Sequence, residues 1–335
     1  GTASSVWRAT WQVKDLDETL TGHQMTLLRV PVDAEETFVG DGIPPFKSTN
    51  PLSLNYLIAR RAGENLCSTF ISLFVPHTGD LFIKSVRLLK VTPGEDTVAL
   101  AVERRGETDV VISSLDASVR REVEGGIAFR GRFGVLTLND QGRPLRATLV
   151  GGGELKKARQ GIALAGDVVG TVTAMDPDAR TVRVKVDNAG ALPGDLPELI
   201  HREALVSVAT AHVPHRTHRT CGLRIFEVRR SDGDLLLGFG PQDLQVARVP
   251  MDAVDAAAGA LTTKAHLPPA SVGYYDGAYA TDETGRVGLR VHKVETDGTI
   301  HLTAGAETFR ATDLRIFEIG PGDRIRISAA GQWSS

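Results

Sequence analysis

The chain has 335 residues, a formal net charge of −3 and 41% hydrophobic residues. This length exceeds the size at which a single hydrophobic core is usual, so we expect more than one compact unit. A slightly negative chain lacks the basic field that attracts nucleic acid or an anionic membrane, and no apolar stretch approaches the ~20 residues of a membrane-spanning helix. We therefore expect neither nucleic acid nor a membrane as a partner.

The start of the sequence and its cysteines give limited information. The first residue is Gly1, not Met, and no signal peptide follows it. We interpret the chain as a mature, processed or truncated product. Cys67 and Cys221 lie far apart in the sequence, and their spacing leaves open whether they are two thiols or one disulfide.

Period-two alternation of apolar and polar residues dominates the first half of the chain and predicts β-strands. The predicted strands lie at residues 7–13, 25–32, 56–60, 69–75, 81–91, 97–102 and 109–115. Turn-forming pairs with Gly, Asp or Pro separate them. Many short strands at this spacing indicate a sandwich or a barrel. We predict an all-β protein with an antiparallel β-sandwich followed by one or two small β-barrel-like or hairpin units.

Residues 126–150 are typical of a β-meander, and the three glycines at 151–153 are expected to interrupt it. New strands are predicted at 166–174 and 181–186. This change places the sandwich domain at residues 1–155, with small β domains at 156–248 and 249–335.

The last third contains a weak repeat of an alternating strand, an Asp-Gly turn and a return strand. It occurs at 222–237 and at 288–302, and its first strand recurs at 314–319. The repeat predicts β-hairpins. Helices are predicted only at 196–204 and 252–261, where the second segment is rich in alanine.

The closest group of potential metal ligands consists of His212, His215 and His218. On a strand, residues three apart point to opposite faces, so His215 would face away from the other two. Arg216 and Arg219 also place positive charge beside the imidazoles. We therefore favour a solvated polar segment and predict no metal site and no cofactor.

Two further groups combine residues that are suited to acid–base or anion-binding chemistry. Asp15 and Asp17 precede His23, but the segment is also typical of a turn between strands. Arg60 and Arg61 follow an apolar run, and guanidinium groups match the oxygens of carboxylates and sulfates. The alternative, which we favour for the second group, is a strand end with one arginine in solvent and one paired with an acid.

The aromatic cluster of the chain contains Tyr274, Tyr275 and Tyr279. Aromatic rings stack on the apolar faces of sugars, and the tyrosine hydroxyl offers a hydrogen bond. A tyrosine-rich turn packed at the edge of a core is the alternative interpretation.

The first half resembles the C-terminal β-sandwich of heparinase II/III-like polysaccharide lyases. The resemblance covers about residues 7–155. It rests on WQVKD at 11–15, GH at 22–23, YLIARRAG at 56–63, FISLFVP at 70–76, FIKSVRL at 82–88, DVVISSLD at 109–116 and FRGRFGV at 129–135.

This resemblance implies a protein that acts on acidic, uronate-containing polysaccharides such as glycosaminoglycans, in the periplasm or as a secreted protein. Members of the family cleave by β-elimination, with catalytic residues mainly on an N-terminal helical toroid. We expect the toroid to be a separate domain or companion chain, and we assign no catalytic residue here. His23, Arg60 and Arg61 match the pattern of the family as candidates for facing a shared cleft.

Two alternatives stay open at this point. The tyrosine cluster motivates a non-catalytic carbohydrate-binding or scaffold protein. The third hypothesis, a lyase complete within this chain, is disfavoured because His23 has no tyrosine near it in the sequence.

Overall fold

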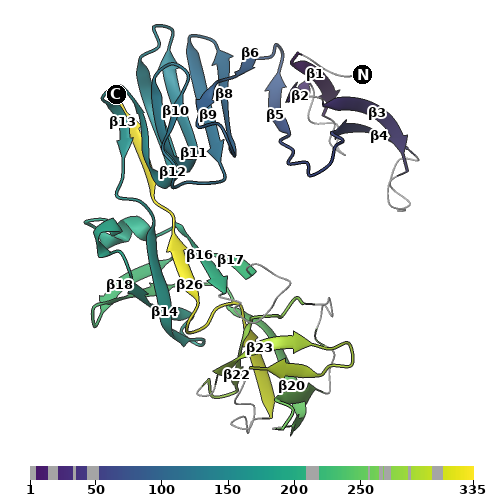
Figure 1. Cartoon of the computed structure of the whole chain (residues 1–335), viewed down its shortest axis with the longest axis vertical. Coiled ribbons are helices and arrows are strands. Elements are labelled where there is room, and N and C mark those ends of the chain that lie inside the picture. Colours follow the sequence, from purple (N-terminus) through teal and green to yellow (C-terminus); the bar gives the residue numbers. More distant parts are fainter. Residues whose placement is uncertain are drawn as a thin grey trace. The chain divides into compact units, whose positions relative to one another are not determined.

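The structure is a computed structural model that describes residues 5–13, 22–32, 35–43, 53–208, 219–255, 257–263, 267, 273–285, 288–303 and 312–335. Within these residues the chain is built almost entirely of β-strands, and its only regular helices are the short 3₁₀ segments η1, Ala189–Ala191, and η2, Leu196–Leu199 (Figure 1). The all-β prediction is confirmed. No helix among the described residues has the length and hydropathy required to span a membrane.

The chain divides into two compact units, and each is described separately. The first contains residues 1–149, 154–163 and 331–335, and the second contains residues 150–153 and 164–330.

The first unit contains a three-stranded antiparallel sheet in the order β1, β2, β5. Its strands are β1 Trp7–Gln12, β2 His23–Val30 and β5 Ile71–Thr78. A separate hairpin joins β3 Glu36–Gly42 to β4 Leu54–Arg60.

A larger, nine-stranded sheet completes the first unit. Its main path is β13 Gln160–Ala163, β12 Pro144–Lys157, β11 Ile127–Asn139, β9 Glu107–Ser114, β8 Thr97–Arg104 and β6 Ile83–Leu88, and the strands that pair beside this path are β7 Val91–Thr92, β10 Arg121–Val123 and β27 Ala330–Ser334. Leu28 and Val75 of the smaller sheet pack with Val86, Leu100 and Val102 of the larger sheet. These two apolar faces form the core of the predicted sandwich.

The second unit contains a seven-stranded sheet. Its order is β17 Arg219–Arg224, β16 Glu203–Val208, β26 Arg324–Ile327, β14 Val168–Asp176, β15 Thr181–Val186, β19 Asp234–Gly238 and β18 Glu227–Ser231. Asp232 and Gly233 connect β18 to β19 with positive φ angles of 53° and 88°. Positive φ at both positions is typical of a tight hairpin turn, so the predicted Asp-Gly hairpin is confirmed here.

A closed barrel completes the second unit. Its strands follow the order β20 Gln245–Asp255, β21 Ala260–Thr263, β24 Ile300–Leu302, β23 Gly288–Val294, β22 Tyr279–Asp282 and β25 Asp313–Phe317. Closure leaves no free sheet edge, and Leu261, Ile300 and Ile316 fill the interior. The hairpin predicted at 288–302 forms β23 and β24 of this barrel.

Both predicted helices are wrong. The segment 196–204 contains only the short 3₁₀ helix η2, which is followed by strand β16. In the segment 252–261, strand β20 ends at Asp255 and a turn leads to β21. In that turn the Asp255 carboxylate accepts backbone hydrogen bonds from Ala257 and Ala258, each at 3.0 Å. Pairing with distant strands outweighs the weak helix preference of these segments.

The strands also cross the sequence boundaries that were predicted for domains. Strand β12 continues through the glycines at 151–153, where Gly151 N donates to Ala329 O and Gly153 O accepts from Leu164 N. Near the C-terminus, β26 lies between β16 and β14, and β27 pairs with β12. Pairing between residues far apart in sequence therefore brings β26, from the segment 249–335, into the sheet formed by strands of the segment 156–248.

Candidate functional site

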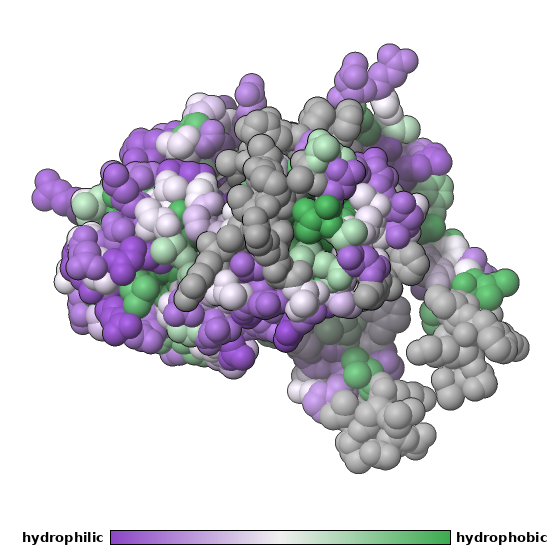
Figure 2. Space-filling model, turned by 90° about the horizontal axis from the view of Figure 1, so that it is seen from below, coloured by the Kyte–Doolittle hydropathy of each residue, from purple (hydrophilic) through white to green (hydrophobic). Residues whose placement is uncertain are grey.

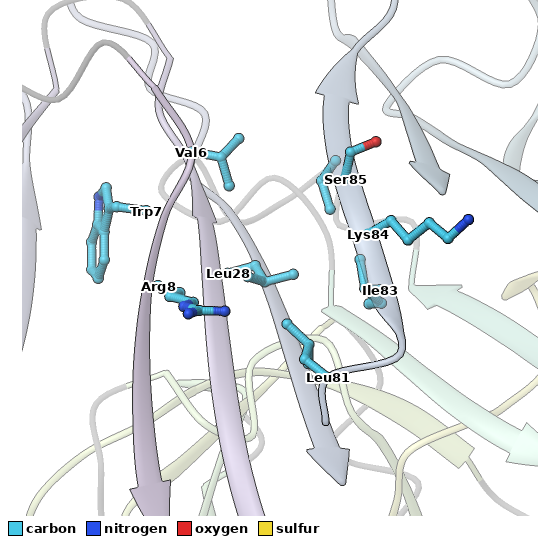
Figure 3. A pocket seen from close by; sticks show the side chains of 9 residues that line it. Val6, Trp7, Arg8, Leu28, Leu81, Ile83, Lys84 and Ser85 are labelled. Atoms are coloured by element: carbon cyan, nitrogen blue, oxygen red, sulfur yellow. The ribbon is translucent and has the colours of Figure 1, made fainter. Parts of the chain in front are cut away.

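A cleft in the first unit lies between β1 and β2 on one side and β6 on the other (Figure 3). Its volume of about 460 Å³ falls within the range of small-molecule sites. The lining residues are Val6, Trp7, Arg8, Leu28, Leu81, Ile83, Lys84, Ser85 and Val86. No carboxylate is among these described lining residues, so the charged groups that they contribute favour a neutral or anionic ligand.

Arg8 is the charged side chain best placed to bind in this cleft. It is opposite Leu28 in the register of β1 and β2, and strand alternation directs both toward the side of the sheet that faces β6. Its side chain is exposed, and no hydrogen bond or ion pair joins it to another described residue. Leu81 and Ile83 add apolar walls around this guanidinium.

The other polar residues of the cleft are directed elsewhere. Ser85 donates a hydrogen bond of 2.9 Å to a carboxylate oxygen of Glu103. Figure 3 shows the Lys84 amine pointing away from β1 and β2, whereas the Arg8 guanidinium points toward the β6 side. The guanidinium of Arg8 is thus the cation that a ligand in the cleft would meet.

A second pocket of about 460 Å³ has the opposite electrostatic character. Its charged lining residues are Lys84, Glu103, Arg104, Glu107 and Asp140, so three carboxylates accompany two cations. Arg104 forms an ion pair with Glu107 and donates from Nε to Asp109 at 2.8 Å. Arg104 and Glu107 are therefore already paired, which reduces the capacity of this pocket to bind a charged ligand.

Asp109 lies at the centre of that network. Burial alone would raise the pKa of its carboxyl, but hydrogen bonds from Arg104 and Thr137 and the charges of Arg104 and Arg146 outweigh it and hold the pKa below its usual range. The Thr137 hydroxyl donates at 2.6 Å. The ionised carboxylate is therefore favoured in the folded protein, and its bonds connect β8, β9 and β11.

The structure does not bring the predicted His23, Arg60 and Arg61 together in this cleft. His23 begins β2 and is exposed. Arg60 ends β4, forms an exposed ion pair of 2.6 Å with Glu36 and lies 5.2 Å from the centre of the Phe38 ring. Arg61 donates to the backbone oxygen of Cys67 at 3.3 Å. Arg60 thus has the paired strand-end arrangement that was the alternative interpretation.

The tyrosine cluster does not form a sugar-stacking platform. Tyr275 is 1% exposed and belongs to the barrel core, so its ring cannot stack on a ligand at the surface. Tyr274 is 38% exposed and meets Tyr275 edge to face at 4.8 Å between ring centres. Tyr279 is half-buried, and burial raises the pKa of its hydroxyl against the opposing charge of Arg290. The tyrosines are mainly part of the barrel structure.

Arg290 shows how completely polar groups near the barrel are paired. It forms an ion pair of 2.7 Å with Asp323, which is 1% exposed, and donates to the backbone oxygens of Gly277 and Pro321. Its guanidinium also lies 5.2 Å from the Tyr279 ring centre. This arrangement ties β23 to the turn before β26.

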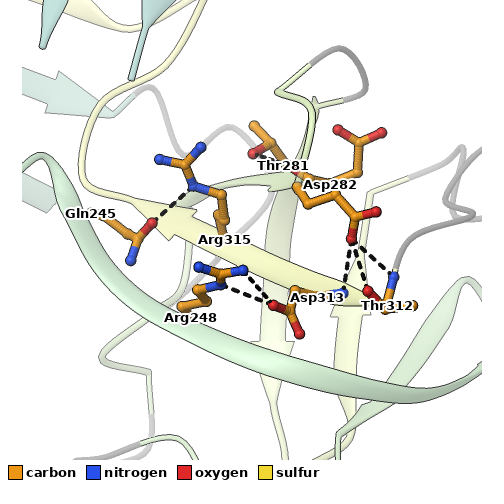
Figure 4. Close-up of polar contacts among 8 residues, drawn as sticks. Gln245, Arg248, Thr281, Asp282, Thr312, Asp313 and Arg315 are labelled. Carbon is orange, nitrogen blue, oxygen red and sulfur yellow. Dashed lines mark hydrogen bonds and ion pairs between the residues drawn. The ribbon is translucent and has the colours of Figure 1, made fainter. Parts of the chain in front are cut away.

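A second polar group lies on the outside of the barrel (Figure 4). Arg248 of β20 binds Asp313 of β25 at 2.7 Å, and Arg315 donates to Gln245 at 2.9 Å. The Glu283 carboxylate accepts from the hydroxyl and backbone nitrogen of Thr312. These contacts join neighbouring strands and explain their polar residues without a ligand.

The remaining predicted groups cannot be placed. Asp15, Asp17, His212, His215 and His218 lie outside the described residues. Within the described part of the chain, no group of three or more His, Cys, Asp or Glu side chains is arranged to hold a metal ion. Cys67 and Cys221 do not form a disulfide bond; the first is exposed and the second is half-buried.

Sequence reasoning treated Arg8 only as a polar residue of an alternating strand. Its alternation with Trp7 predicted that it leaves the apolar side of β1. The cleft itself forms only because β6 lies near β1 and β2, and the alternation of residues along β1 does not predict that position of β6. Among the described residues on the face seen in Figure 2, hydrophilic ones predominate, with apolar residues scattered among them.

The comparisons with known proteins add no family assignment. No protein-family model matches the sequence, and no curated protein matches it.

Proposed function

We propose that this chain is the C-terminal β portion of a heparinase II/III-like polysaccharide lyase and binds acidic, uronate-containing polysaccharide. In this proposal it is non-catalytic by itself and completes the substrate cleft of a helical toroid domain or companion chain. The family resemblance of residues 7–155 motivates the lyase assignment and a periplasmic or secreted location.

The observation that carries the proposal is the exposed Arg8 guanidinium in a cleft whose described lining residues include no carboxylate. A uronate carboxylate matches the fork of donors that an arginine presents, and the resulting charge-assisted bonds are stronger than those between neutral groups. The apolar walls from Leu28, Leu81 and Ile83 suit the less polar face of a sugar ring. A neutral polysaccharide would leave the cation without a partner.

A binding titration tests this assignment. We expect the chain to bind uronate oligomers and to bind neutral oligomers of equal length at least tenfold more weakly. Arg8→Gln should lower the affinity for the uronate oligomers about 10-fold, because a charged hydrogen bond is worth about 1.5–3 kcal/mol. Arg130→Gln is the matched control, since Arg130 is exposed on β11 and does not line the cleft.

Two results would contradict the proposal. Equal affinity for uronate and neutral oligomers would show that the ligand need not be acidic. Equal losses of affinity in the Arg8 and Arg130 variants would show that the ligand does not bind in this cleft. The absorbance of unsaturated uronate products tests the non-catalytic part separately. We expect no turnover by the purified chain, and sustained turnover would show that its own residues form a complete lyase site.

A further inference from the structure

Beside the cleft, three side chains form a continuous chain of hydrogen bonds across the small sheet. The hydroxyls of Thr10 and Thr26 are 2.8 Å apart, and the Thr26 hydroxyl is 2.9 Å from Nε2 of His77. Nδ1 of His77 lies 2.9 Å from the backbone oxygen of Gly79. Thr26 is 1% exposed, whereas Thr10 at the end of the chain is exposed.

The direction of these bonds follows from the one partner that can only accept. Because the Gly79 oxygen is a carbonyl, Nδ1 of His77 must carry the hydrogen. In the neutral ring Nε2 is then an acceptor, so the Thr26 hydroxyl donates to it. The oxygen of Thr26 in turn receives the hydroxyl hydrogen of Thr10. This order leaves the Thr10 oxygen presenting lone pairs to the exterior, as a hydrogen-bond acceptor.

The exposed end of the chain lies on the same side of the sheet as Arg8. Alternation along β1 puts Arg8, Thr10 and Gln12 on one face, with successive members about 7 Å apart. Opposite Gln12 in the register lies Gln24, which pairs in turn with His77. None of the residues that the three strands place on this face is a carboxylate. A row of neutral hydrogen-bonding groups therefore extends from the cation.

We propose that Thr10 forms a second subsite, which accepts a hydrogen bond from a free hydroxyl on the sugar next to the uronate at Arg8. The inference rests on the proposed function and narrows its substrate class to oligosaccharides of two or more units. Lone pairs directed outward repel sulfate or carboxylate oxygens. The sugar next to the uronate is thus expected to carry an unsulfated hydroxyl at this position.

The test compares a uronic acid monosaccharide with an unsulfated uronate-containing disaccharide and its sulfated counterpart. We expect the parent chain to bind the unsulfated disaccharide more tightly than either other ligand, by about 3- to 10-fold, the worth of one neutral hydrogen bond. Thr10→Val should abolish this preference and leave monosaccharide affinity unchanged. Thr10→Ser, which retains the hydroxyl, should preserve it, and Thr78→Val on the opposite face of β5 is the control.

The results separate this inference from the proposed function. If Arg8→Gln weakens binding but Thr10→Val retains the disaccharide preference, the second subsite is refuted and the uronate cleft stands. Equal binding of the three ligands by the parent refutes the subsite in the same way. If the parent binds none of them, both proposals fail. Thermal unfolding of Thr10→Ser and Thr10→Val establishes that the measured variants are folded.

Discussion

Two arginines on neighbouring strands of the small sheet have opposite environments. Arg8 of β1 is paired with Leu28 of β2, and Arg29 is the next residue of β2. Because successive side chains of a strand point to opposite faces, Arg8 and Arg29 lie on opposite faces of the sheet. Arg29 is 4% exposed and binds fully buried Glu35 through two hydrogen bonds of 2.7 and 2.6 Å. It also donates to Ser72 and lies over the Phe70 ring, whereas Arg8 has no such partner among the described residues.

The difference separates a structural use of arginine from a binding use on the same sheet. A buried guanidinium must have its hydrogen bonds and charge satisfied within the protein, so Arg29 has little capacity left for a ligand. An exposed guanidinium beside a cleft keeps its donors available and contributes little to folding. We therefore expect substitutions that break the Arg29 ion pair to lower the unfolding free energy, and substitutions of Arg8 to lower the affinity for a ligand.

The largest effect is expected for Glu35→Ala, which leaves the Arg29 charge buried and unpaired. We expect a loss of about 3–5 kcal/mol in unfolding free energy, as for other broken buried ion pairs. Denaturant unfolding followed by tryptophan fluorescence measures it in the first unit, which contains Trp7, Trp11 and Trp333. The adjacent Glu36→Ala, which breaks only the exposed pair with Arg60, should cost no more than about 1 kcal/mol. Similar losses in both variants would contradict the comparison.

An intermediate effect is expected for Asp109→Asn, because its ion pair with Arg104 is only partly buried. At pH 7 we expect a loss of about 1–2 kcal/mol from the weakened hydrogen bonds. The lowered pKa of Asp109 stabilises the fold above the unfolded value of about 4, and that contribution disappears as the pH falls through the folded pKa. Unfolding curves of parent and variant should therefore converge in acid.

The matched control for this pH effect is Asp140→Asn. Asp140 is exposed in the nearby turn between β11 and β12, and it is not among the groups that shift the pKa of Asp109. We expect its stability difference from the parent to be small, as for other exposed positions. A difference for Asp109→Asn that stays constant into acid would mean that its ionisation is not linked to folding.

The smallest stability effect is expected for Arg8→Gln. Its unfolding free energy should stay within about 0.5 kcal/mol of the parent, as for exposed positions without structural contacts. The same fluorescence measurement used for Glu35→Ala gives the direct contrast. A loss approaching that of Glu35→Ala would show that Arg8 supports the fold, and would leave the cleft without an available cation.

Much of the fold followed from local patterns. Alternation from Trp7 onward placed β1, and the Asp232–Gly233 pair placed a hairpin, because both signals act within a few residues. The helix prediction at 252–261 failed for the converse reason. Its alanine content favours a helix only weakly, and pairing of β20 with β25 and β21 decided the structure.

The candidate site was less predictable than the fold. Tyr275 and Arg60 were selected for chemistry suited to sugars, yet one fills a barrel core and the other pairs with Glu36. The hydrogen-bonded chain from Thr10 to His77 joins residues 67 positions apart in the sequence. Its members are ordinary in composition, so only their pairing across three strands reveals it.

By itself, the sequence determined that this protein is a set of short antiparallel strands, since alternation and turn residues express preferences of neighbouring residues. The tertiary structure decided which strands pair, where β26 and β27 return, and which arginine is buried. Those outcomes depend on contacts between distant segments. Alternation along each strand determines on which face of its strand Arg8 or Arg29 lies. Only tertiary packing determines that Glu35 pairs with Arg29 and that a cleft lies beside Arg8.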